Sequence, residues 1–200
     1  MRTFRLIGLT ALAALTAMVF VEVPSAMAEG STALCKVDQG PCETKNLISH
    51  IHEETLDGNP AKLLSEPTIE CKVLFLGDAS PTLGNPLLVT GKFSYLNCTT
   101  GCLIEEVGGP ATLKVLRLGA ELADVTSKGE VKMTCIFGFI KCVYNHDGLL
   151  GHSLGPLTSA EPNGEVRLEE QSLRKVSGTC PTLTKLDILL TPLTATYISS

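Results

Sequence analysis

EVKMTCI, the stretch from Glu130 to Ile136, switches between polar and apolar side chains at every step as far as Cys135. Successive side chains of a β-strand point to opposite faces, so this alternation is the pattern of a strand with one buried and one solvated face. A helix would instead repeat its apolar residues every three or four positions. The stretch therefore predicts a half-buried antiparallel strand.

The segments on either side of it also predict strands. Turn sequences such as Asp57–Pro60, Gly108–Pro110 and Pro162–Gly164 divide the chain into short runs. We predict strands at Leu47–His52, Thr68–Phe75, Leu87–Tyr95, Thr112–Leu118, Glu130–Ile136, Lys141–Asn145, Glu165–Gln171, Lys185–Leu190 and Thr194–Ile198. Leu116–Asp124 is the one passable helical segment, and we expect strand there too. The predicted fold is all-β, a disulfide-stabilised antiparallel sandwich or irregular barrel.

The N-terminus has the three parts of a secretory signal peptide. Two arginines near the start precede an apolar run of sixteen residues, Leu6–Val21, and Ala26-Met27-Ala28 places small residues where signal peptidase reads. We predict a signal peptide over residues 1–28 and a single secreted β domain over 29–200, extracellular or in the cell envelope. A spanning helix needs roughly twenty apolar residues. We therefore expect no transmembrane segment in the mature chain, and a retained N-terminal anchor is the alternative.

Composition excludes several classes of partner. The chain has 16 basic and 21 acidic residues, and losing Arg2, Arg5 and Glu22 with the signal leaves 14 against 20, a net charge of −6. With no basic cluster, nucleic acid and anionic lipid are not expected partners. The chain has no Trp and few aromatic residues, which weakens a sugar-binding role because sugar platforms use aromatic faces.

Cysteine is the most informative residue type in the mature chain. Its eight cysteines are Cys35, Cys42, Cys71, Cys98, Cys102, Cys135, Cys142 and Cys180. An even number in an exported chain predicts a disulfide framework with no free thiol. Structural zinc is the alternative, and only the Cys98 and Cys102 spacing approaches that of zinc ligands.

Eight cysteines permit 105 pairings in principle, but local spacing favours some of them. The predicted pairs are Cys35–Cys42, Cys98–Cys102, Cys135–Cys142 and Cys71–Cys180. The first three each close a short turn, and the last joins an early strand to a late one across about 110 residues. By loop-closure entropy the long bridge would contribute the most, about 5 kcal/mol.

Gly151-His152-Ser153-Leu154-Gly155 matches the G-x-S-x-G elbow of α/β-hydrolases in its letters. That elbow needs a strand before the serine, a helix after it and a histidine later in the chain. All four histidines precede Ser153, and Pro162-Asn163-Gly164 would end any following helix early. We therefore interpret the motif as a glycine-flanked loop and predict no catalytic residues.

Histidines offer the second chemical hypothesis. His50, His52 and Glu54 would project from one face of a strand, and His146, Asp147 and His152 lie near one turn. Convergence of the two groups would make a metal site, but solvent-facing histidines are the commoner case. The adjacent carboxylate pairs Glu53-Glu54, Glu105-Glu106 and Glu169-Glu170 would point to opposite faces of their strands. We predict no metal and no cofactor.

The segment Thr32-Ala33-Leu34-Cys35-Lys36, followed by Pro41-Cys42 and the remaining cysteine order, resembles a group of uncharacterised exported cysteine-rich bacterial proteins. The resemblance covers most of the mature chain and rests on cysteine spacing. It implies export and disulfides, and it implies no activity.

Two function classes remain open: a non-enzymatic structural or surface-association domain, and a small secreted hydrolase whose site is not recognisable. The first has one specific surface. Ile136, Phe137, Phe139 and Ile140 surround Gly138, and the segment either folds back onto the core or forms a rigid apolar tip. If Phe137 and Phe139 are exposed, we expect this tip to bind a cell-surface protein or envelope component.

Overall fold

The computed structural model describes residues 31–37, 41–65, 68–118, 122–154, 165–180 and 183–199. The strands are β1 (Thr32–Cys35), β2 (His50–Glu54), β3 (Ala61–Leu64), β4 (Ile69–Ala79), β5 (Leu83–Gly84), β6 (Leu87–Leu96), β7 (Leu103–Arg117), β8 (Leu122–Cys135), β9 (Ile140–Asn145), β10 (Leu150–Leu154), β11 (Glu165–Gly178), β12 (Leu183–Pro192) and β13 (Tyr197–Ser199). Three short 3-10 turns accompany them, η1 (Thr44–Asn46), η2 (Thr99–Gly101) and η3 (Ile136–Gly138). The predicted all-β class is confirmed. The predicted signal peptide lies outside the described residues.

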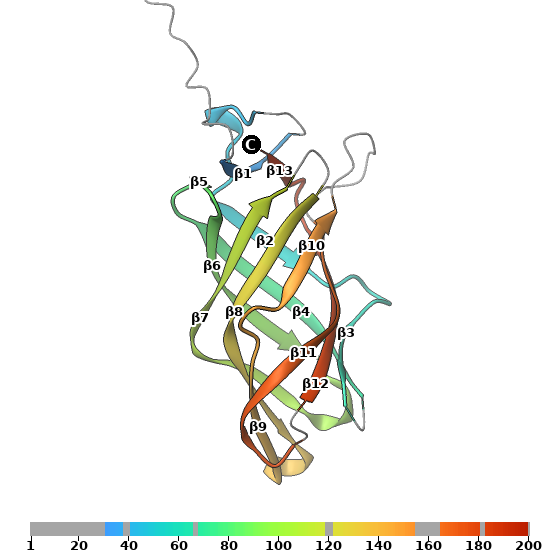
Figure 1. The fold of residues 1–200 in the computed structure, drawn as a ribbon. Helices are drawn as coiled ribbons and strands as arrows, with labels where there is room; N and C mark the ends of the chain where they lie inside the picture. Colours follow the sequence, from blue (N-terminus) through green and yellow to red (C-terminus); the bar gives the residue numbers. More distant parts are fainter. Residues whose placement is uncertain are drawn as a thin grey trace, which may run out of the picture.

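Ten strands form one antiparallel sheet that closes on itself (Figure 1). Its order is β10-β11-β9-β8-β7-β6-β4-β2-β12-β3, and β11 also pairs with β12. β2 and β3 lie one after the other between β4 and β12, and β9 and β10 do the same between β8 and β11. The wall therefore has six continuous strands and two composite ones. Of the two predicted architectures, sandwich and irregular barrel, it is the irregular barrel.

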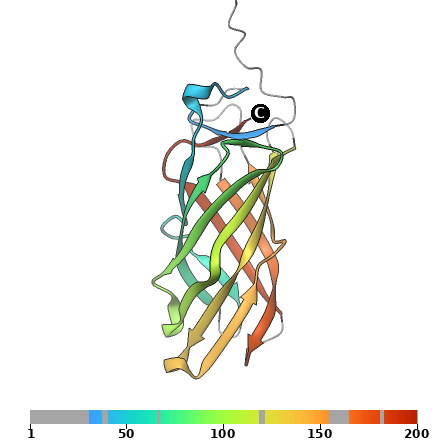
Figure 2. The same ribbon diagram turned by 90° about the vertical axis from the view of Figure 1, so that its left-hand side faces the viewer.

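A second, three-stranded sheet of order β13-β1-β5 lies across one end of the barrel (Figure 2). Thr32 Oγ1 accepts a hydrogen bond from the backbone N–H of Arg117 at 3.0 Å, which joins this cap to the end of β7. The cap has a small core of its own around Ala33, Cys35 and Cys42. One end of the barrel is thus covered by the chain itself.

Alternation places the core inside the barrel. On β8, Val131, Met133 and Cys135 are buried while the residues between them face outward, as the pattern of this stretch predicts. On β4 the buried series is Ile69, Cys71, Val73 and Phe75, which pack together within the main core cluster. Ile136 is an exception, because it leaves the strand and begins η3.

One predicted boundary is wrong. Gly108 and Gly109 do not end a strand: they have φ values of 80° and 114° and form an irregularity inside β7, where pairing with β8 shifts between Val107 and Thr112. Glycine tolerates such φ values, so a turn-like sequence can bend a long strand without ending it. In Leu116–Asp124, where strand was expected over helix, the described residues at both ends are strand: the segment contains the end of β7 and the start of β8.

All eight cysteines are in disulfides, as the even count predicts, but the predicted connectivity is largely wrong. The bonds are Cys35–Cys42, Cys71–Cys98, Cys102–Cys135 and Cys142–Cys180. Only Cys35–Cys42 matches. The three predicted pairs Cys98–Cys102, Cys135–Cys142 and Cys71–Cys180 do not form.

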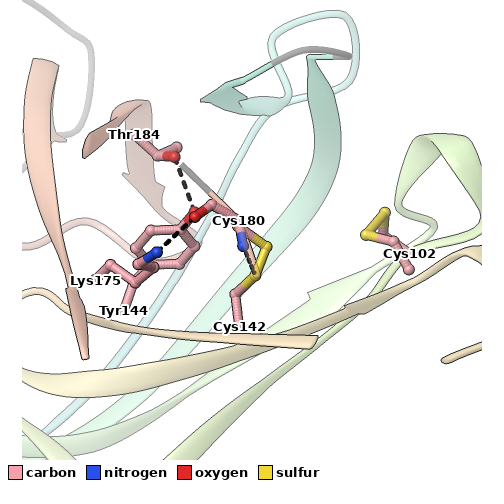
Figure 3. The surroundings of a disulfide bond; sticks show 7 residues. Cys102, Cys142, Tyr144, Lys175, Cys180 and Thr184 are labelled. Atoms are coloured by element: carbon pink, nitrogen blue, oxygen red, sulfur yellow. Dashed lines mark hydrogen bonds between the residues drawn. A yellow bond between two sulfur atoms is a disulfide. The ribbon is translucent and has the colours of Figure 1, made fainter. Parts of the chain in front are cut away.

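Strand register explains the pairing. Leu103 pairs with Thr134, which places Cys102 and Cys135 opposite each other at the end of the β7–β8 pair. Gly178 pairs with Cys142, and Cys180 follows two residues later (Figure 3). Cys71 similarly precedes the β4–β6 ladder. Each long-range bridge thus joins neighbouring strands.

Among the described residues, no helix is both long and apolar enough to cross a membrane.

Candidate functional site

The predicted apolar tip connects β8 to β9 at the barrel end opposite the cap (Figure 1). Phe139 is 83% exposed and Ile136 is 53% exposed, whereas Ile140 is partly buried against the main core. The side chain of Phe137 lies outside the described residues. The expectation that the segment folds back onto the core therefore holds for Ile140 but not for Ile136 or Phe139.

Disulfides anchor both sides of this tip, though not by the predicted Cys135–Cys142 bond. Cys135 directly precedes Ile136 and is bonded to Cys102 on the β7 side. Cys142 follows Ile140 by two residues and is bonded to Cys180 after β11. The two arms of the tip, its β8 side and its β9 side, are therefore each joined by a disulfide to a different neighbouring strand. This restricts the motion of the apolar residues between them.

Ile136 has a left-handed backbone, with φ of 50°. A β-branched residue rarely adopts this region because its side chain clashes with the backbone. Exposed β-branched residues in such a conformation occur where surrounding structure fixes the chain, often at functional sites. Sequence reasoning missed Leu103, an exposed apolar residue next to Cys102 at this end of the barrel.

The barrel interior contains a cavity of about 60 Å³, lined almost entirely by apolar side chains. Ser127 and His146 are the polar exceptions apart from the tyrosines, and both are buried. Ser127 Oγ donates to the backbone carbonyl of His146 at 2.7 Å and lies 3.2 Å from His146 Nδ1. Since the single hydroxyl proton is already donated, Nδ1 carries the proton in the second contact.

Nε2 of His146 is left as the acceptor of the ring. It is buried and has no hydrogen-bond partner among the described residues. Burial lowers the pKa of His146, with the nearby Asp147 charge opposing the shift. Gly129 makes room for the ring, because a Cβ there would lie 2.6 Å from Nε2.

The side chain of Glu106 accepts a hydrogen bond from a backbone N–H group of the barrel wall. Pairing between β6 and β7 ends at Gly91 and Ala111, and Glu106 Oε2 accepts the backbone N–H of Phe93 at 2.9 Å beyond that point. Its Oε1 is buried without a partner among the described residues. Burial raises the pKa of Glu106, while hydrogen bonds from Phe93 and Ala111 lower it.

Glu53 is a second buried carboxyl group, on β2. It is 5% exposed, and its Oε2 has no partner among the described residues. Burial alone raises its pKa to about 8. The alternation of β2 points Ile51 and Glu53 inward, so strand parity is the signal that sequence reasoning could have used.

The histidines of the metal hypothesis are not brought together. His50 is paired with Asp78 on the outer face of the barrel, Glu54 is paired with Lys72 at 3.0 Å, and His152 lies 3.0 Å from Asp124. His146 lies inside the barrel. Within the described ranges, no group of three or more His, Cys, Asp or Glu side chains is arranged to hold a metal ion.

The G-x-S-x-G segment is not the predicted loop. Gly151–Leu154 belong to β10, where Ser153 pairs with Ala123 of β8 and Val166 of β11. A serine paired on both sides within a three-strand ladder does not lie at the sharp turn of a nucleophile elbow. Gly155 and the side chain of Ser153 lie outside the described residues.

The carboxylate pairs follow the predicted alternation in two of three cases. Glu53 and Glu105 each face away from the following glutamate. Glu169 and Glu170 instead border the same surface hollow, because β11 is irregular between Leu168 and Gln171 and Glu170 has φ of 45°. Arg167 and Lys185 pair with these two carboxylates.

No protein-family model matches the chain, and no curated protein or solved structure matches it either. The resemblance to uncharacterised exported proteins stays a prediction.

Proposed function

We propose that this chain is an exported, non-enzymatic protein that binds a cell-surface or envelope protein through an apolar tip consisting of Ile136 and Phe139. The observation that carries the proposal is the exposure of Phe139 between two disulfide-anchored arms. A large exposed aromatic side chain is the usual anchor of a protein interface, where it fills a pocket of the partner.

Rigidity supports a binding role for the tip. An exposed phenylalanine on a mobile loop would lose conformational entropy on binding, and this loss reduces affinity. Here Cys135 and Cys142 hold the segment on both sides. The left-handed φ of Ile136 indicates a segment held in a conformation that its own sequence disfavours.

A protein partner is favoured over a membrane surface by charge. Peripheral binding to anionic lipid usually combines apolar insertion with a cluster of basic residues. The ten residues from Met133 to Cys142 contain one basic residue, Lys141, and the mature chain has an acidic excess. An apolar tip whose own segment carries a single basic residue fits a hydrophobic groove on a protein.

The hydrolase alternative receives no support from the one serine–histidine contact described. A serine nucleophile must give its proton to the histidine. Ser127 instead donates to the carbonyl of His146 and accepts from Nδ1, and both residues are buried. In this contact the histidine donates the proton and the serine accepts it, which is the opposite of the direction between a serine nucleophile and its base.

The proposal can be tested by measuring binding of the labelled mature protein to cell-envelope material of the source organism. Phe139→Ser should weaken saturable binding by tenfold or more, since anchor residues commonly contribute 2 kcal/mol or more. Leu76→Ser is the matched control, because Leu76 is 55% exposed on β4, on the side of the barrel. Its binding should equal that of the wild type.

Protease treatment of the envelope material separates protein from lipid as the partner. Loss of binding after treatment supports a protein partner. Binding that survives treatment and is reproduced by protein-free vesicles would overturn it. Equal binding by wild type and Phe139→Ser would overturn the role of the tip.

A further inference from the structure

We infer that the barrel interior contains a binding site for a small hydroxyl compound, whose O–H group donates a hydrogen bond to Nε2 of His146. This site is separate from the apolar tip and does not depend on its function. Three observations carry it: an interior cavity, a buried acceptor without a partner, and a neighbouring group that fixes which ring nitrogen accepts.

The cavity gives the apolar surroundings. It has a volume of about 60 Å³ and is bordered by residues that include Phe93, Val125, Met133 and Leu149. Phe93 meets the ring of His146 edge to face, with 6.1 Å between the ring centroids. A ligand here would have an apolar body against these side chains and one polar group toward His146.

The acceptor is defined by the hydrogen bonds of Ser127. Its hydroxyl proton is donated to the His146 carbonyl, so His146 Nδ1–H donates to Ser127 Oγ and Nε2 retains its lone pair. His146 is 5% exposed, and Nε2 has no partner among the described residues. A buried acceptor without a donor is costly, so a ligand that supplies one is favoured.

The chemistry of the site selects a donor. Among the described residues near Phe93, Nε2 of His146 and Oε1 of Glu106 are buried acceptors to which no hydrogen bond is donated. Burial also lowers the pKa of His146, which favours its neutral, accepting form. An alcohol satisfies this requirement, whereas an ether of the same size does not.

Volume limits the size of the ligand. A cavity of about 150 Å³ accommodates benzene, and water takes about 30 Å³ in the liquid. The 60 Å³ here therefore suits a molecule of about two or three non-hydrogen atoms, such as methanol or ethanol. Ligands this small reach at best millimolar dissociation constants.

Ethanol and dimethyl ether test the inference because they are isomers and only ethanol has a donor. Each is titrated into the mature protein while NMR follows the methyl groups of Leu149 and Met133. We expect saturable shifts with ethanol and about fivefold weaker binding of dimethyl ether, since one net hydrogen bond is worth about that factor. Equal affinity for the two isomers, or shifts that do not saturate, would overturn the inference.

Two variants separate the acceptor from the cavity. His146→Phe removes Nε2 and should reduce ethanol binding to the level of dimethyl ether, whereas His152→Phe, on the outer face beside Asp124, should leave the preference unchanged. If His146→Phe does not fold, Val125→Ile adds one methyl group to the cavity lining and should abolish binding of both isomers. An ethanol preference that persists in His146→Phe, or binding unchanged in Val125→Ile, contradicts the site.

Discussion

Cys142 of β9 is bonded to Cys180, and this bridge lies beside a buried hydrogen bond from Thr184 to the hydroxyl of Tyr144 (Figure 3). Lys175 Nζ also donates a hydrogen bond of 2.8 Å to the backbone carbonyl of Cys180. The disulfide thus joins β9 to the end of β11, and the Thr184–Tyr144 hydrogen bond joins β9 to β12.

Removing this bridge should destabilise the barrel more than removing the bridge in the cap. Cys142 and Cys180 are 38 residues apart and Cys35 and Cys42 are 7 apart, and loop-closure entropy assigns them about 4 and about 2.5 kcal/mol. Urea unfolding of the Cys142→Ala/Cys180→Ala and Cys35→Ala/Cys42→Ala variants measures the difference. A larger loss in the cap variant would contradict this ranking.

Non-reducing peptide mapping should find Cys71 linked to Cys98 and Cys102 linked to Cys135. Cys98 and Cys102 flank η2, but Cys98 lies beside β4 and Cys102 lies beside β8. They are therefore not bonded to each other. A peptide in which Cys98 is linked to Cys102 would contradict the register of both strand pairs.

Sequence patterns predicted the local structure better than the long-range contacts. The alternation in Glu130–Cys135 is a local property, because each residue's face follows from its neighbours. Disulfide partners and barrel closure depend on which strands meet, and Cys102 meets Cys135 only because β7 and β8 pair over their full length. The spacing of cysteines does not contain that information.

The interior site shows the same limit. Ser127 and His146 are 19 residues apart and meet because the chain turns from β9 into β10 beside β8. The inward series on β8 includes Val125, Ser127 and Val131, so parity could have placed Ser127 inside the barrel. No local signal places His146 beside it.

Replacing Ile136 with asparagine should stabilise the protein while weakening the proposed binding. Asparagine adopts a left-handed backbone more readily than a β-branched residue, and Ile136 is too exposed to contribute much burial. We expect a gain of about 0.5–1 kcal/mol in urea unfolding. Ile136→Val keeps β-branching and should show no gain; a gain of the same size in that variant would contradict the role of backbone strain.

Glu53 should make the stability of the fold decline as pH rises. Its pKa is about 8 in the folded protein and near the usual 4.5 when unfolded, so between these values the folded state holds a proton that the unfolded state has lost. The unfolding free energy then falls with increasing pH across that window and levels off above it. The full change is on the order of 4–5 kcal/mol for a shift of this size.

Glu53→Gln isolates this contribution, because glutamine resembles the protonated acid and does not titrate. The variant and the wild type should have similar stability at pH 4, and the variant should become progressively more stable than the wild type toward pH 8. Glu54→Gln is the matched control, since Glu54 faces outward and pairs with Lys72. Urea unfolding at a series of pH values measures all three proteins. Parallel pH profiles for the wild type and Glu53→Gln would show that the carboxyl group of Glu53 ionises in the folded state at its ordinary pH.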